Sequence, residues 1–71
     1  MKEITFENLS LRGLQMTTTP NEKDNLYNTV IFGTDRETGV EIVASGFHSK
    51  EFTSQMKALI NANEQISKKH S

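Results

Sequence analysis

Residues 27–45 read YNTVIFGTDRETGVEIVAS, and this stretch decides the fold. Its two ends, residues 27–32 and 40–44, are rich in β-branched and aromatic residues, which favour strands. Between them, Asp35 can accept hydrogen bonds from turn backbone, and Gly39 can adopt a positive φ without steric cost. We therefore expect an antiparallel hairpin over residues 27–45, closed by a type I turn and a glycine bulge.

The alternation of side chains along the hairpin predicts its two faces. On the inward face we expect Val30, Phe32, Val40, Ile42 and Ala44. The other face then carries Tyr27, Thr29, Ile31, Glu41 and Val43. Two of these, Ile31 and Val43, are unusual on a solvated face. They are either singly exposed or part of a contact surface.

A C-terminal helix is expected over residues 49–68, after Gly46 ends the second strand. Ser49 suits an N-cap, and Glu51 lies in the first turn, where the helix dipole favours an anion. One apolar stripe contains Phe52, Met56, Leu59, Ile60 and Ile66. The stripe predicts a helix that lies across the sheet. Its spacing, with Asn63 included, also fits a short heptad seam in which Asn63 sets the register.

The first 25 residues contain a weaker strand pattern and a polar segment. Ile4 and Phe6 alternate with polar residues, which predicts either one bent strand or two short strands within residues 2–17. Residues 17–25 contain Pro20 and no large apolar residue, so we expect a loop there. This loop is either a solvated connector or a binding loop that orders on a partner.

Length and composition predict a single small domain over residues 1–71. The fold class is α+β, an antiparallel sheet of three to four strands packed against one C-terminal helix. The chain has no cysteine, which excludes a disulfide scaffold and a Cys-ligated zinc finger. Its net charge of −1 excludes a strongly basic nucleic-acid-binding protein. No run of about 18 apolar residues could form a membrane span. Since residues 1–4 also begin no secretory signal, we expect a cytoplasmic protein without a membrane partner.

Few residues could support catalysis or bind a metal. The only imidazoles are those of His48 and His70, and no acid is placed to orient either one. His48 and Glu51 would supply two metal ligands where zinc needs at least three from the protein. Asp35 and Glu37 are expected to be solvated in the hairpin turn. We therefore expect no catalytic residue, no metal and no cofactor.

Residues 32–57 contain a strand, the turn Asp-Arg-Glu-Thr-Gly-Val at 35–40, a second strand and a helix start, Ser-Lys-Glu-Phe, at 49–52. This arrangement resembles small bacteriophage proteins encoded among the head and tail genes. The resemblance implies an assembly or accessory role with a protein partner, and it supplies no catalytic residue.

The leading hypothesis is a small non-enzymatic protein-interaction module, such as a phage accessory or assembly protein or a host-directed inhibitor. Its partner would be a host protein or a second copy of the chain, because so small a core is marginal without a partner. The expected anchors on the partner are Tyr27, Ile31, Val43 and Ile66.

The alternative is a weak nucleic-acid-binding domain. Residues 1–47 contain four basic and seven acidic side chains, whereas residues 48–71 contain four basic and two acidic. The cations of the C-terminal part are Lys50, Lys57, Lys68 and Lys69. They could contact phosphates, but four lysines beside an acidic sheet give little non-specific affinity.

Overall fold

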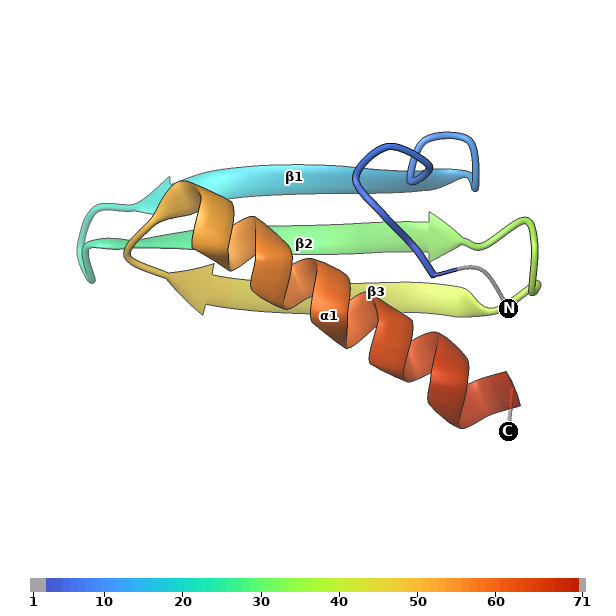
Figure 1. Ribbon diagram of the computed structural model, residues 1–71. Helices are drawn as coiled ribbons and strands as arrows, with labels where there is room; N and C mark the ends of the chain where they lie inside the picture. Colours follow the sequence, from blue (N-terminus) through green and yellow to red (C-terminus); the bar gives the residue numbers. More distant parts are fainter. Residues whose placement is uncertain (1–2, 71) are drawn as a thin grey trace.

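The computed structural model describes residues 3–70, and their side chains as far as residue 68. The elements follow the order β1 (Leu14–Asn21), β2 (Leu26–Thr34), β3 (Glu41–His48) and α1 (Glu51–His70). The three strands form one antiparallel sheet in the order β1-β2-β3, as Figure 1 shows. The expected α+β fold, a sheet packed against one C-terminal helix, is confirmed.

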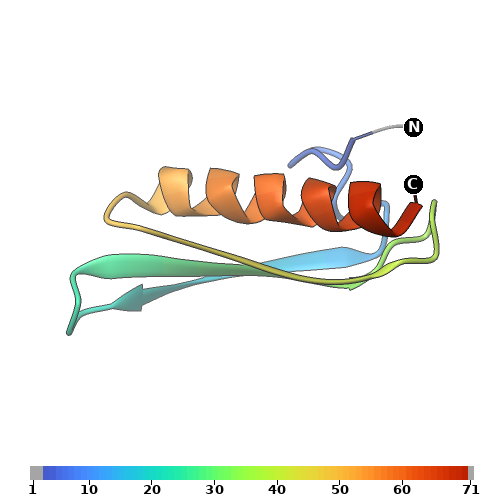
Figure 2. The same ribbon diagram turned by 90° about the horizontal axis from the view of Figure 1, so that it is seen from below.

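The elements form two layers. In Figure 2, α1 and the N-terminal segment lie on the same side of the sheet, and the other side carries no further element of the described chain. We call the side toward α1 the inner face and the opposite side the outer face. Helix α1 crosses the inner face diagonally, and its C-terminal end extends past the edge of β3 (Figure 1). The sheet is therefore covered on one face only.

The hairpin expected over residues 27–45 is present as β2 and β3. Phe32 pairs with Val43 across the two strands, and Gly39 adopts a φ of 75° in the connecting turn, as the sequence predicted. Strand β3 continues through Gly46 to residue 48, so the expectation that Gly46 ends the strand was wrong.

The predicted faces of β2 were wrong. Thr29 and Ile31 are fully buried on the inner face, whereas the side chain of Phe32 is 37% exposed on the outer face. Residues 30–32 are all apolar, so the sequence does not show which of them point to the inner face. The pairing with β3 decides this. Because directly paired residues share a face, Ile31 follows its buried partner Ala44 to the inner face.

Helix α1 buries small side chains in place of much of its predicted apolar stripe. Ser54, Ala58 and Ala62 are fully buried against the sheet. Ser54 and Ala58 lie against Gly46, where an added Cβ would overlap the carbonyl oxygen of Ser54 and lie 2.5 Å from the backbone nitrogen of Ala58. Small residues on both sides bring helix and sheet backbones close together. The larger side chains of the predicted stripe are consequently displaced from the interface, and three of them are exposed: Phe52, Met56 and Ile60.

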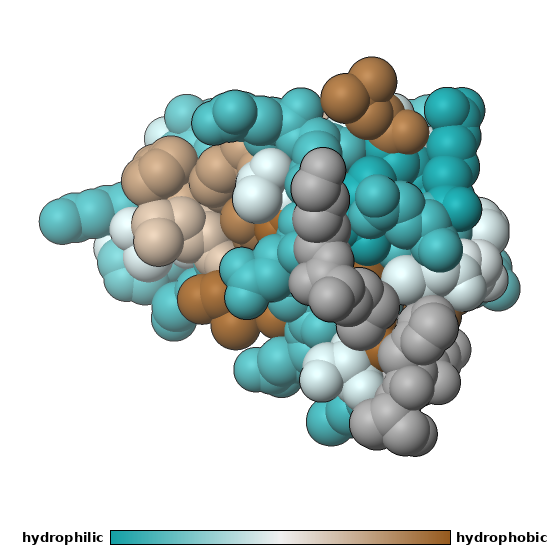
Figure 3. All heavy atoms as spheres, turned by 45° about the vertical axis from the view of Figure 1, so that its right-hand side comes forward, coloured by the Kyte–Doolittle hydropathy of each residue, from teal (hydrophilic) through white to brown (hydrophobic). Residues whose placement is uncertain are grey.

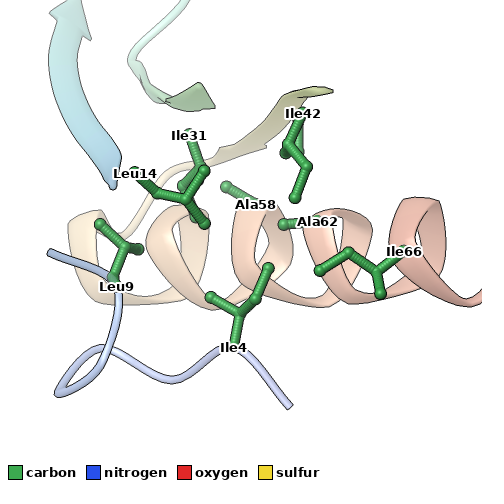
Figure 4. Packing of buried hydrophobic residues seen from close by; sticks show 9 residues of the cluster. Ile4, Leu9, Leu14, Ile31, Ile42, Ala58, Ala62 and Ile66 are labelled. Carbon is green, nitrogen blue, oxygen red and sulfur yellow. The ribbon is translucent and has the colours of Figure 1, made fainter. Parts of the chain in front are cut away.

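The hydrophobic core lies between α1, the inner face and the N-terminal segment (Figure 4). Ile66 points into it beside Ile4 and Ile42, and only 3% of its surface is exposed (Figure 4). The complete cluster consists of Ile4, Leu9, Leu14, Ile31, Ile42, Ala44, Ala58, Ala62 and Ile66. The core of this small domain thus depends on the N-terminal segment as well as on the regular elements.

The first 25 residues differ from the prediction in two ways. Residues 6–13 form successive turns instead of a strand, although Ile4 is buried. Residues 17–21, expected to begin a loop, belong to β1, and the β1–β2 turn occupies only residues 22–25, with Asn25 at a φ of 58°. A polar stretch rich in β-branched threonine can form a strand when one of its faces is solvated.

Candidate interaction surface

The outer face of the sheet carries a group of exposed apolar side chains. Phe32 of β2 and Val43 of β3 are direct cross-strand partners and are 37% and 67% exposed. Phe47, two pairs along β3 on the same face, is 55% exposed. Val30, between these positions on β2, is half-buried. We call Val30, Phe32, Val43 and Phe47 the outer apolar patch.

Polar groups border this patch. Asn28 lies on the outer face between its cross-strand partners Thr19 and Phe47. Its side-chain oxygen Oδ1 is buried and accepts no hydrogen bond from the described part of the chain. A buried acceptor without a donor costs free energy. The rest of the outer face of β1 is uncharged and exposed: Gln15, Thr17 and Thr19.

The four anchors expected from the sequence do not form one surface. Val43 is exposed on the outer face. Ile31 and Ile66 are 0% and 3% exposed, so their prediction as partner-binding residues was wrong. The reversed phase of β2 buries Ile31, and the N-terminal segment together with Ile42 covers Ile66. Tyr27 is half-buried and pairs with Pro20 and His48, which places it on the inner face.

Sequence reasoning missed Phe32 and Phe47 as surface residues. The number of residues in the hairpin connection could have placed Phe32, because it sets which residues of the two strands are paired. Once Val43 is placed on the outer face, the register of the hairpin places Phe32 there too. Phe47 lay beyond the predicted end of the second strand, so no face was assigned to it.

A second set of exposed apolar side chains lies on the helix-bearing side. The rings of Phe6 and Phe52 are 5.8 Å apart and inclined at 43°. Met56 and Ile60 continue along α1 at intervals of four residues and are 43% and 56% exposed. Figure 3 shows apolar atoms reaching the surface between polar ones on this side. Here Phe52 is in contact within the chain, whereas the outer apolar patch has no covering element in the described chain.

The lysines of the nucleic-acid alternative are exposed where the structure describes them. Lys50 precedes α1 and therefore lies outside the helix that carries Lys57. Lys57 and Lys68 are eleven residues apart in α1, which places them on one side of the helix. The side chain of Lys69 lies outside the described residues.

The possible catalytic groups have structural contacts. The ring nitrogen Nδ1 of His48 accepts a hydrogen bond of 3.0 Å from the backbone N–H of Lys50, directly before α1. Within the described residues, no three His, Cys, Asp or Glu side chains gather as metal ligands would.

A buried ion pair holds the turn of the hairpin against the N-terminal segment. The guanidinium of Arg12 donates from Nε and Nη2 to the two carboxylate oxygens of Asp35, at 2.7 Å each. Thr38 donates its hydroxyl to the same carboxylate, and Glu37 lies 3.1 Å from Nη1 of Arg12. Asp35 is fully buried, so the expectation of a solvated side chain was wrong for it, whereas Glu37 is 48% exposed.

This environment changes the pKa values of both partners. The hydrogen bonds from Arg12, aided by the one from Thr38, outweigh desolvation and lower the pKa of Asp35 from 3.8 to about 2. The hydrogen bond to Asp35 in turn raises the pKa of Arg12. The ion pair links the N-terminal turns to the turn of the hairpin. It offers no group poised to exchange a proton near neutral pH.

Comparisons of the chain with protein-family models, with curated proteins and with solved structures found no match. Among the residues that the structure describes, no helix has both the length and the apolar character needed to cross a membrane.

Proposed function

We propose that this chain is a small non-enzymatic protein-interaction module that binds a protein partner through the outer apolar patch. The observation that carries the proposal is the one-sided layering of the fold. Helix α1 covers the inner face, while Phe32, Val43 and Phe47 share an outer face that no described segment covers. Exposed apolar groups that cluster on one face are typical of protein-binding surfaces.

The chemistry of the patch suits recognition of another protein. Two aromatic rings beside β-branched side chains provide rigid apolar anchors, and aromatic anchors contribute much of the binding energy at protein interfaces. The expected partner therefore presents a complementary apolar surface.

An accessory, assembly or host-inhibiting role in a phage, in the cytoplasm of its host, is part of the same proposal. It rests on the resemblance of residues 32–57 to small phage proteins. That segment contains three members of the outer apolar patch, Phe32, Val43 and Phe47.

The test is crosslinking and affinity capture in cells that produce the chain. Val43→Lys and Phe47→Lys place a charge in the patch at exposed positions. Leu11→Lys changes a side chain that is 77% exposed in the N-terminal turns and serves as the control. We expect the wild type and Leu11→Lys to capture the same proteins, and Val43→Lys and Phe47→Lys to capture none of them. The circular dichroism spectra of the variants should match that of the wild type. The same captured set for all four chains, or none with the wild type, would contradict the proposal.

Nucleic-acid binding is the alternative, and it rests on Lys57 and Lys68 sharing one side of α1. A gel shift in about 50 mM salt that is lost at about 200 mM would favour it. The variant Lys57→Gln should weaken such a shift, whereas Val43→Lys should not.

A further inference from the structure

We propose that the free edge of β1 pairs in antiparallel fashion with β1 of a second copy of the chain, with Thr17 on the two-fold axis. The sheet has two edges, the outer sides of β1 and β3. An edge strand presents unpaired backbone groups, and folds usually cover or block them.

The edge of β3 is blocked by side chains of α1. The side-chain amide of Gln65 accepts from the N–H of Val43 at 3.3 Å and donates to its carbonyl oxygen at 2.7 Å. Asn61 donates to the carbonyl oxygen of Ser45 at 3.3 Å. These amides occupy the places that the backbone of a neighbouring strand would take. The edge of β3 is therefore closed to another strand.

The same contacts establish which residues of β1 point to its free edge. The N–H and carbonyl groups of Val43 point away from β2, since they bond to Gln65. The N–H and carbonyl groups of its cross-strand partner Phe32 therefore point toward β1, where Phe32 is paired with Gln15. Since backbone groups alternate along a strand, the outward-pointing residues of β1 are Leu14, Met16, Thr18 and Pro20. The N–H of Leu14 confirms this phase, because it bonds to the carbonyl oxygen of Leu9 outside the sheet at 3.0 Å.

The middle of this edge is open. No helix or strand of the described chain runs along the outer side of β1 (Figure 1). Within residues 3–70, no group bonds to the backbone of Met16 or Thr18 on that side. Residues 14–21 also contain no charged side chain to repel a second strand. The N-terminal turn and Pro20 restrict the edge only at its two ends.

The edge is complementary to itself. A two-fold axis at Thr17 places Met16 opposite Thr18 of the second copy, where both residues exchange backbone hydrogen bonds. The same axis places Leu14, whose N–H is already bonded, opposite Pro20 of the second copy, which has no N–H. The two positions unable to donate thus face each other without forming a hydrogen bond, and the backbone pairing rests on Met16 and Thr18. Thr17 meets Thr17 of the second copy on the outer face, and such threonine pairs stabilise sheets.

The pairing would merge two sheets into one of six strands, with both helices on the same side. Two outer apolar patches would then share one continuous outer face. Pairing through β1 does not depend on what that face binds, so it can be disproved without affecting the proposed function, and the reverse.

Cysteine crosslinking tests the register. The chain contains no cysteine, so each variant carries a single thiol. In the proposed pair, the Cβ atoms at position 17 lie about 4.5–5.5 Å apart, close enough for a disulfide after slight adjustment. With oxidised glutathione, Thr17→Cys should form covalent dimers roughly tenfold faster than the controls Thr19→Cys and Ser45→Cys, which are equally on the outer face. Equal rates for the three variants would contradict the register.

Light scattering over a range of concentrations tests the pairing without a new thiol. We expect a dimer that Thr17→Lys dissociates, because two like charges meet on the axis, and that Val43→Lys leaves intact. A wild type that stays monomeric up to millimolar concentration would overturn the inference. A dimer that Val43→Lys dissociates and Thr17→Lys does not would overturn it too, since self-association would then occur through the outer apolar patch.

Discussion

The guanidinium of Arg12 and the carboxylate of Asp35 form a two-pronged ion pair between residues 23 positions apart, with both nitrogen–oxygen distances at 2.7 Å. The two side chains are 3% and 0% exposed. Arg12 lies in the N-terminal turns and Asp35 follows β2, so the pair joins the first part of the chain to the hairpin. Next to it, the N–H of Arg36 donates to the carbonyl oxygen of Arg12 at 2.9 Å.

Replacing Asp35→Asn should destabilise the fold strongly. The change removes the buried counter-charge of Arg12 and leaves the guanidinium with the half-exposed carboxylate of Glu37. Breaking a buried ion pair typically costs about 3–5 kcal/mol. Urea unfolding followed by circular dichroism measures the loss. Glu37→Gln is the control, since Glu37 is 48% exposed and should contribute less than about 1 kcal/mol. Equal midpoints for the two variants would show that the buried pair is not a major source of stability.

The same carboxylate should make the stability depend on acid pH. The pKa of Asp35 is about 2 in the fold against an ordinary 3.8. Because the pKa of Asp35 is lower in the folded than in the unfolded chain, its carboxylate stabilises the fold at pH values above the unfolded pKa. This contribution disappears as the pH falls from about 4 to about 2. One pKa unit corresponds to about 1.4 kcal/mol, so roughly 2 kcal/mol is at stake. Unfolding free energies measured across this range should fall for the wild type more steeply than for Asp35→Asn. Parallel curves would contradict the assignment.

Gly46→Ala should weaken the contact between helix and sheet. The new Cβ would overlap the backbone of α1 at Ser54 and Ala58, and neither backbone can rotate away as a side chain would. Overpacking of this kind costs on the order of 2 kcal/mol. Thermal unfolding provides the measurement, with Ser45→Ala on the exposed outer face as the control. A melting temperature equal to that of the control would mean that α1 can shift without loss.

Asn63→Ala should release the N-terminal segment from α1. The amide of Asn63 accepts from the N–H of Ile4 at 2.7 Å and donates to its carbonyl oxygen at 3.0 Å. Losing both bonds should cost about 1–2 kcal/mol and speed hydrogen exchange at the Ile4 amide. The exposed neighbour Glu64→Ala serves as the control. Unchanged exchange at Ile4 would show that core packing alone holds this segment.

Gln65→Ala should open the edge of β3. The N–H and carbonyl oxygen of Val43 lose their partner and face water instead, at a cost of about 1 kcal/mol. An open edge also favours association through β3, which sedimentation at increasing concentration would detect. Glu64→Ala should show neither effect. A variant that keeps the stability and the mass of the wild type would mean that Gln65 does not protect this edge.

Several features of the fold could be predicted from local sequence. The β-branched runs on either side of a turn rich in polar residues and glycine predicted the β2–β3 hairpin, and the positive φ of Gly39 followed from its place in the turn. The apolar periodicity after residue 49 predicted a C-terminal helix. Each of these signals depends only on residues close together in the sequence, so it can be read without the tertiary structure.

The faces and the partners of the side chains could not be predicted in the same way. Asn63 was interpreted as a residue that could set the register of a helix pair, yet it binds the backbone of Ile4. Asp35 had the pattern of a solvated turn residue, yet Arg12 buries it. Each of these contacts joins residues far apart in the chain. Only Val43 among the four expected anchors lies on the outer apolar patch.

The sequence by itself determined the hairpin, the helix and the α+β class, because strand propensity, turn chemistry and helical periodicity act over a few residues. The tertiary structure decided which sides of these elements are buried. Gly46 lets α1 approach the sheet closely at Ser54 and Ala58, and Phe52, Met56 and Ile60 of α1 point outward. The register of β3 turns Ile31 inward and leaves Phe32 exposed. The physical reason is that close packing selects one face of each element through backbone contacts between distant residues.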